Sequence, residues 1–228
     1  MRLAHRDALS TLRKRARPSW LFAVVITAAC SSTYYGAMEK MGWHKRDLLV
    51  DRVKDARDVQ EATKEEFRDA LETFSSVVNF DGGDLQQNYD RLRRAYDRSE
   101  SKATQVRKRI GSVEKVASDL FKEWEKELTE YSNPDFRRSS ENQLHETRRR
   151  YEGLIDVMKR AEAKMSPVLT ALNDQVLYLK HNLNARAIAS LQGTAAGIQN
   201  DVASLIAEME AAINEADQFI REMGEQGA

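Results

Sequence analysis

The chain has 228 residues, of which 36 are basic and 36 acidic, so its formal net charge is zero. This balance argues against a nucleic-acid-binding protein, which needs a basic patch. A single cysteine, Cys30, excludes a disulfide within the chain. Charged residues make up 32% and aromatic residues 7%, with only three prolines, and this composition is typical of long helices or a coiled coil.

The N-terminal segment has the order of a secretory signal. An apolar run from Trp20 to Ala29 leads directly to Cys30. The leader before it is basic, with one acid, Asp7, against Arg2, Arg6, Arg13, Lys14, Arg15 and Arg17. A cysteine after two alanines resembles the cleavage and acylation site of bacterial lipoproteins. We therefore predict a signal peptide over residues 1–29, lipidation of Cys30 and a lipid-anchored linker over 30–44.

An uncleaved signal anchor is the alternative interpretation. No charged residue occurs between Pro18 and Met38, about the length that spans a bilayer as a helix. Both interpretations export the rest of the chain, because the basic leader stays cytoplasmic. In the lipoproteins that this segment resembles, aspartate after the cysteine marks inner-membrane retention in many Gram-negative bacteria. Ser31 stands there instead, and this resembles an outer-membrane destination facing the periplasm. Cleavage would leave 30 basic and 35 acidic residues, a net charge of −5.

The first predicted helix covers residues 45–78. Its apolar and small residues alternate by three and four, with Gln60 as the one polar position on that face: Val53, Ala56, Thr63, Phe67, Ala70, Phe74 and Val77. The segment 79–85 then predicts a tight turn, because Gly82 and Gly83 favour a helix end. Asp84 is a natural N-cap for the next helix, with Gln87 three residues later.

The second predicted helix carries the strongest periodic signal. It runs for about 45 residues, or about 70 Å, which is too long for a rounded domain of this size. Its apolar face comprises Leu85, Tyr89, Leu92, Tyr96, Ser99, Ala103, Val106, Ile110, Val113, Ala117, Leu120, Trp124 and Tyr131. A rod is therefore expected.

A third helix is predicted to begin at Pro134, with Asn133 as its cap, and to kink at Pro167. Gly193 and Gly197 predict the last turn, before a helix from Ile198 to Met223. The sum is an all-α fold, an elongated antiparallel bundle of three to four long helices over 45–223, with 224–228 fraying. The later part of the third helix is expected to return beside the first helix and the start of the second.

No motif predicts catalysis. The histidines, at positions 5, 44, 145 and 181, lack the spacing of a zinc site. The chain contains neither a phosphate-binding loop nor a nucleophile elbow. The aspartates of the 79–85 turn do not follow the spacing of a calcium loop. We expect no enzyme, no metal and no cofactor.

One stretch, 178–191, is apolar around more than one helix face and also carries polar residues. Burial between neighbouring helices is the simpler interpretation, and a partner-binding surface is the other. The residues of the possible partner surface are Tyr178, Lys180, His181, Asn182, Asn184 and Arg186.

Five segments together resemble an uncharacterised family of bacterial envelope proteins that is known only as a domain of unknown function. They are Cys30 with its flanks, His44–Val53, Asn79–Leu85, Arg137–Ser140 and Lys180–Ser190. Some relatives carry a label suggesting a DNA-repair ATPase. Because this chain lacks a phosphate loop, we attribute that label to coiled-coil similarity with long ATPase arms.

The expected function is that of a lipid-anchored periplasmic rod with a structural or partner-binding role in the cell envelope. Its partners would be the membrane, through the lipid on Cys30, and an envelope protein, with self-association possible and no nucleic acid. A membrane-active helical hairpin, with 178–191 entering lipid, is the alternative.

Overall fold

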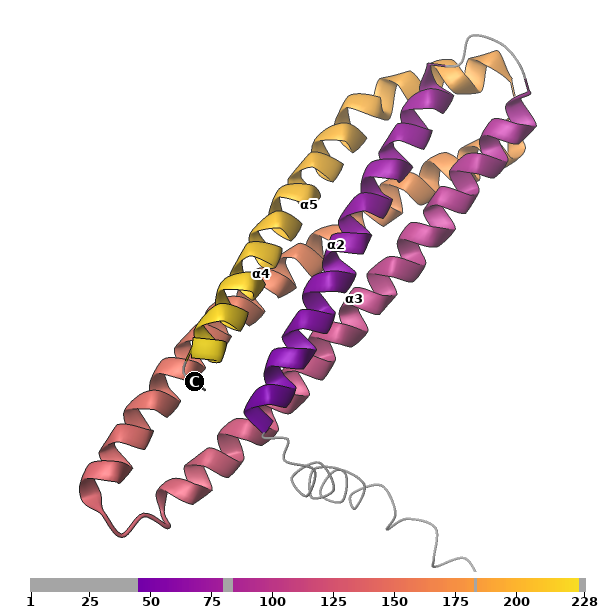
Figure 1. The fold of residues 1–228 in the computed structure, drawn as a ribbon. Coiled ribbons are helices and arrows are strands. Elements are labelled where there is room, and N and C mark those ends of the chain that lie inside the picture. The colour runs from indigo at the N-terminus through magenta and orange to yellow at the C-terminus, as the bar shows by residue number, and fades with distance from the viewer. Residues whose placement is uncertain (1–44, 80–83, 183, 226–228) are drawn as a thin grey trace, which may run out of the picture. The chain divides into compact units, whose positions relative to one another are not determined.

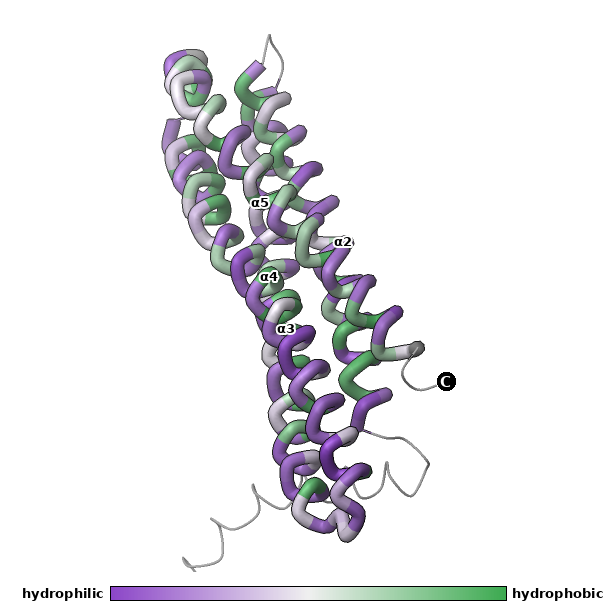
Figure 2. The backbone as a smooth tube through the Cα atoms, turned by 90° about the vertical axis from the view of Figure 1, so that its left-hand side faces the viewer, coloured by the Kyte–Doolittle hydropathy of each residue, from purple (hydrophilic) through white to green (hydrophobic). Residues whose placement is uncertain are grey.

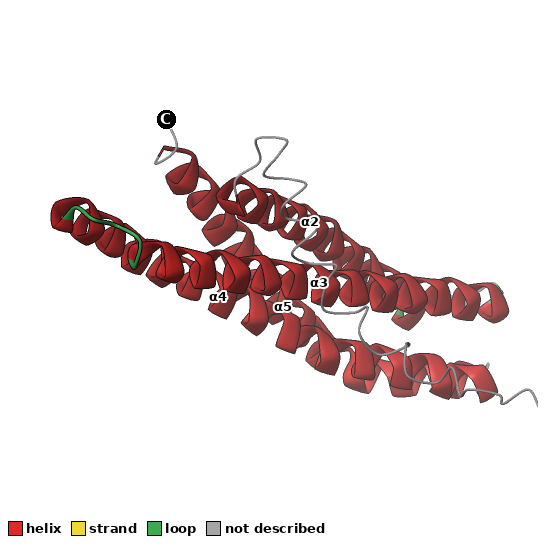
Figure 3. Ribbon diagram, turned by 90° about the horizontal axis from the view of Figure 1, so that it is seen from below, coloured by secondary structure: helices red, strands yellow, loops and turns green. Residues whose placement is uncertain are grey.

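The structure, a computed structural model, describes residues 45–79, 84–182 and 184–225. Within these ranges the chain forms four helices and no strands: α2 (Lys45–Val78), α3 (Leu85–Leu128), α4 (Pro134–His181) and α5 (Ala185–Glu225) (Figures 1 and 3). The predicted all-α bundle is confirmed. The predictions of a signal peptide over residues 1–29, of lipidation at Cys30 and of a linker over 30–44 fall outside the described residues.

The beginnings of α3 and α4 follow their predicted capping residues. The Asp84 carboxylate accepts hydrogen bonds from the backbone N–H groups of Gln86 and Gln87, at 2.9 and 3.3 Å. Asn133 does the same for α4, at 2.8 Å from the N–H of Asp135, and Pro134 opens the helix. These side chains satisfy N–H groups that have no partner inside a first helical turn. Both predictions are confirmed.

The helices form a closed ring in the order α2, α3, α4, α5, in which α2 packs against α3 and α5, and α4 packs against the same two helices (Figure 1). We expected the later part of the third helix to lie beside the first helix and the start of the second. Its place beside the start of α3 is confirmed, and its place beside α2 was wrong. That place belongs to α5, which is long enough to run beside α2 and fills the fourth position. Ion pairs join the neighbours: Arg98–Glu66, Arg57–Asp217, Arg160–Glu208 and Lys159–Glu114.

The turn between the last two helices lies at Asn182–Asn184, so its predicted location at Gly193 and Gly197 was wrong. Both glycines are inside α5. The Asn184 side chain accepts a hydrogen bond from the N–H of Ala187, at 3.0 Å, and so caps the new helix. Helix packing overrides the low helix propensity of glycine here, because Leu191 and Ile198 are buried on either side.

The core follows the spacing of three and four residues that the sequence showed on the apolar faces. Hydrophobic residues recur along all four helices (Figure 2). The largest fully buried side chains are Phe67, Phe74, Phe219, Leu49, Leu92, Ile110, Leu154, Met158, Met165, Leu172, Leu179 and Leu191. Helix α4 continues through Pro167, and so does the spacing of its buried residues. Gln60 is completely buried, as its position on the apolar face predicted. Its amide forms no hydrogen bond within the described residues. A buried amide of this kind lowers stability.

The α3–α4 hairpin reaches past the other two helices (Figures 1 and 3). From residue 125 to residue 143 every side chain is exposed except Leu128, which is buried, and Ser140, which is half-buried. We call residues 125–143 the tip. Tyr131 was predicted as the last residue on the apolar face of the second helix. It lies in the tip turn, beyond the end of α3, and its side chain is 44% exposed.

Candidate functional site

The predicted partner residues gather at the α4–α5 turn. Because the turn falls at Asn182–Asn184, the stretch 178–191 is divided between the end of α4 and the beginning of α5. We call the following group the turn surface: Leu177, Tyr178, Lys180, His181, Asn182, Asn184 and Arg186. All are exposed except Asn182, which is half-buried. The expectation that this stretch is mainly buried was therefore wrong for its polar members and right for Leu179, Ala187, Ile188 and Leu191.

Hydrogen bonds join the described residues on the two sides of the turn. The Asn182 amide nitrogen donates to the carbonyl of Tyr178 at 2.9 Å, and the Asn182 N–H donates to the carbonyl of Leu179 at 3.1 Å. The Tyr178 hydroxyl donates to the hydroxyl of Ser190 in α5 at 3.4 Å. Short polar side chains that bond nearby backbone groups favour turns over continued helix. The turn surface therefore lies on a turn whose two helices are hydrogen-bonded to each other.

Further contacts join the turn surface to the bundle. The Gln192 amide donates to the carbonyl of Val78 at the end of α2, at 3.3 Å. Thr194 in α5 contacts the Gln175 side chain in α4 at 3.4 Å. The turn surface therefore lies at the end of the bundle where α2 finishes.

The turn surface combines apolar area with positive charge. Leu177 and Tyr178 are 51% and 40% exposed, and they are two of four large apolar or aromatic side chains that the described residues expose to this degree. In the described part of the chain, Lys180 and Arg186 form no ion pair. Exposed aromatic and aliphatic side chains beside cations are typical of a protein-binding surface. Sequence reasoning missed Leu177, whose signal is a large apolar side chain outside the buried spacing of Val176 and Leu179.

The described chain enters the bundle at the opposite end. The Lys45 ammonium lies 2.5 Å from the Glu123 carboxylate, near the end of α3. The 34 residues of α2 then run toward the end that carries the turn surface. At 1.5 Å per residue this is about 50 Å. The bundle thus separates the point of entry from the turn surface by the length of one helix.

A groove of about 570 Å³ lies between α3 and α4. Its lining is mostly polar and includes Tyr96, Glu100, Arg107 and Asn173. The Tyr96 hydroxyl lies 3.3 Å from the Glu100 carboxylate. Burial, followed by the charge of Glu100, raises the pKa of Tyr96. The phenol therefore stays protonated and acts as a hydrogen-bond donor.

A smaller hollow of about 260 Å³ lies nearer the tip. There the rings of Phe121 and Tyr151 meet edge to face, with centroids 5.5 Å apart, and the Arg148 guanidinium lies 4.9 Å from the Phe121 centroid. Burial raises the pKa of Tyr151 to about 12, helped by the charges of Glu114 and Glu152. These contacts join α3 to α4 just behind the tip.

The described ranges contain neither a cluster of metal ligands nor a membrane-spanning helix. No three histidine, cysteine, aspartate or glutamate side chains are arranged there to hold a metal ion. No described helix combines the length and the apolar composition needed to cross a bilayer.

Comparison with known families places the chain. Residues 34–223 match a family described as proteins of unknown function, DUF2959. The chain belongs to this family. No curated protein matches the chain significantly. The family description names no activity.

Proposed function

We propose that this chain is a lipid-anchored helical rod of the bacterial envelope that binds a protein partner with its turn surface. The lipid sits on Cys30 and the rod faces the periplasm, from the outer membrane. The rod carries the turn surface to a set distance from the membrane, and its role is structural rather than catalytic. The proposal includes no metal and no cofactor.

The observation that carries this proposal is the separation of the two ends of α2. Lys45, the first described residue, pairs with Glu123 at one end, and Gln192 binds the carbonyl of Val78 at the other. An anchor fifteen positions before Lys45, at Cys30, therefore attaches at the end away from the turn surface. Four packed helices give the rod the stiffness to hold that distance.

The anchor itself is supported by the sequence of the leader. A basic segment, an apolar run and two small residues before a single cysteine favour cleavage and acylation at Cys30. The family match begins at residue 34 and leaves the leader out. An uncleaved signal anchor stays the alternative, and it would export the same rod.

The chemistry of the turn surface favours a partner with negative charge around an apolar site. Leu177 and Tyr178 supply the apolar area, and Lys180 and Arg186 supply charge beside it. Opposite charges at an interface guide binding and specificity more than they add affinity. We therefore expect association that weakens as salt concentration rises.

The partner is tested by affinity capture of the tagged full chain after crosslinking in cells. The test variant is Lys180→Glu/Arg186→Glu, and the charge-matched control is Lys108→Glu/Lys115→Glu on the exposed face of α3. We expect the unmodified chain and the control to recover the same envelope protein, and the turn-surface variant to recover severalfold less of it. Equal recovery by all three chains would contradict a partner-binding role for the turn surface.

The anchor is tested by the intact mass of the chain extracted from membranes. We expect a chain that begins at Cys30 and carries the added mass of acyl groups. A Cys30→Ala chain should keep its leader and stay unacylated. An unmodified chain that begins at Met1 would favour the signal anchor and remove the lipid from the proposal.

A further inference from the structure

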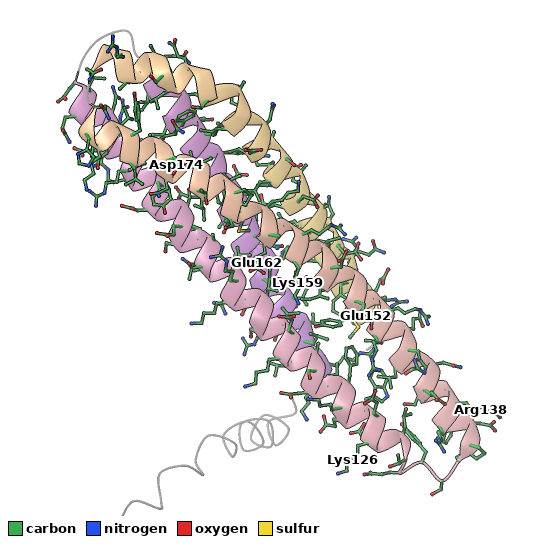
Figure 4. The ribbon with its side chains drawn as sticks, turned by 180° about the vertical axis from the view of Figure 1, so that it is seen from behind. Lys126, Arg138, Glu152, Lys159, Glu162 and Asp174 are labelled. Atoms are coloured by element: carbon green, nitrogen blue, oxygen red, sulfur yellow. The ribbon has the colours of Figure 1, made fainter. Side chains whose placement is uncertain are left out.

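The tip is a second exposed surface, at the end of the bundle opposite the turn surface. Phe136 is 64% exposed and Tyr131 is 44% exposed, and both lie in or beside the turn that joins α3 to α4. Figure 4 shows Lys126 and Arg138 at this end of the hairpin and Asp174 toward the other end of α4. The proposed partner site does not use this surface.

The shape of the tip is fixed by its own hydrogen bonds. The Asn133 side chain accepts from the N–H of Phe136 at 3.4 Å, in addition to its shorter bond with Asp135. The Trp124 indole donates to the Ser140 hydroxyl at 2.8 Å and joins the two helices behind the turn. The two exposed rings are therefore held on a defined turn.

We propose that the tip rests on the same membrane that holds the lipid anchor, with Tyr131 and Phe136 at the level of the lipid head groups. This inference rests on the proposed anchor at Cys30. Tyrosine favours the membrane interface because its ring is apolar and its hydroxyl is polar, and an exposed phenylalanine buries its ring at the boundary between head groups and acyl chains. The tip is then a second membrane contact, in addition to the lipid anchor. These two contacts set the tilt of the rod relative to the membrane.

The place where the described chain begins supports this occupant. Lys45 pairs with Glu123, two positions before the tip, so the chain enters the bundle beside it. Fifteen positions separate Cys30 from Lys45, and a fully extended chain of that length reaches about 50 Å.

The tip projects less far than this tether can reach. Arg150 of α4 pairs with Glu222 near the end of α5, at 3.1 Å. Phe136 precedes Arg150 by fourteen positions, or about 21 Å along the helix. The lipid and the tip can therefore reach one membrane surface together.

The charge of the tip indicates the kind of lipid surface. Residues 125–143 contain three basic and five acidic residues, a net charge of −2. Anionic lipids attract clusters of lysine and arginine, which the tip lacks. The contact is therefore made by the aromatic rings, and zwitterionic head groups are sufficient for it.

The test uses the full chain with its own N-terminus, reconstituted into phosphatidylcholine vesicles. Ser139→Cys, one helical turn after Phe136, carries an environment-sensitive fluorophore, and Ala189→Cys carries it at the opposite end. The chain without an added cysteine is the labelling blank, because an acylated Cys30 does not react. Flotation with the vesicles is measured first, and quenching by aqueous iodide second.

We expect the chain to float, and the label at position 139 to become severalfold less accessible to iodide while the label at 189 does not change. Tyr131→Ser/Phe136→Ser in the Ser139→Cys chain should restore quenching without loss of flotation. A floating chain whose label at 139 is quenched as in water overturns the tip contact and leaves the anchor standing. A chain that does not float overturns both. Protection that survives the double serine change overturns the role of the two rings.

Discussion

Helices α3 and α4 run through both the four-helix part of the bundle and the two-helix tip, where their surroundings differ. Where α2 and α5 cover the hairpin, residues such as Val106, Ile110 and Leu154 are completely or almost completely buried. In the tip only Leu128 is buried, and Phe136 is left largely in solvent. The number of neighbouring helices therefore decides whether a large apolar side chain adds to stability or stays available for binding.

Removing one phenylalanine from each region should change stability by very different amounts. Phe67 in α2 is completely buried, and Phe67→Ala deletes most of its side chain from a packed core. We expect the free energy of unfolding to fall by about 3 to 5 kcal/mol, measured by urea denaturation. If this variant does not fold, Phe67→Leu gives a smaller loss in the same direction.

Phe136→Ala is the matched control in the tip. Because its ring is mostly in water already, its removal should change the free energy of unfolding by about 0.5 kcal/mol or less. A loss comparable with that of Phe67→Ala would mean that the tip is part of the folded core, and the comparison would fail.

Most of the buried pattern in both regions was readable in the sequence. The spacing of Val53, Phe67 and Phe74 predicted the buried face of α2, and Asp84 and Asn133 predicted two helix starts, because periodicity and capping are local properties. Ring order was not readable, since an apolar face does not say which helix covers it. The last turn was missed because glycine is also tolerated inside a well-packed helix, as at Gly193.

The candidate surfaces were readable only in part. The polar residues between Tyr178 and Arg186 could be named, yet their exposure depends on the turn at Asn182–Asn184, which divides a stretch that looked like one helix. Phe136 carries no sequence signal of exposure, and Leu177 carries only its position outside the buried spacing of Val176 and Leu179. Their side chains are exposed because the neighbouring helices end or turn elsewhere, and that is decided by packing across the whole bundle.

At the boundary between the two regions, Tyr151 should make the free energy of unfolding depend on pH, with an effect of intermediate size. Tyr151 packs against Phe121 just behind the tip, and burial raises its pKa to about 12. An unfolded chain ionises tyrosine near pH 10, so the folded state holds the phenol proton more tightly. The resulting stabilisation is complete below pH 10 and is lost as pH rises through about 12.

Because the Tyr151 side chain is half-buried, we expect a loss of about 1 to 2 kcal/mol over that range, less than the full shift implies. The measurement is urea denaturation between pH 9 and pH 12 for the unmodified chain and for Tyr151→Phe. Their difference isolates Tyr151 from other groups that titrate there. A difference that stays constant with pH would mean that this ring is solvated like the tip rather than held like the four-helix part.

The smallest prediction tests how far the four-helix part extends toward the turn surface. If α5 begins at Ala185, Gly193 is inside a helix, on an exposed face with no atom near the position of an added Cβ. Gly193→Ala should then raise the free energy of unfolding by about 0.5 to 1 kcal/mol, because alanine loses less backbone freedom on folding. Gly111→Ala, equally open within α3, is the matched control and should give a similar gain. A helix end at Gly193 would instead need a left-handed backbone, where alanine is strained. If Gly193→Ala lowers stability while Gly111→Ala raises it, the last turn lies at the glycines and not at Asn182–Asn184. The part of the bundle that supports the turn surface is then shorter.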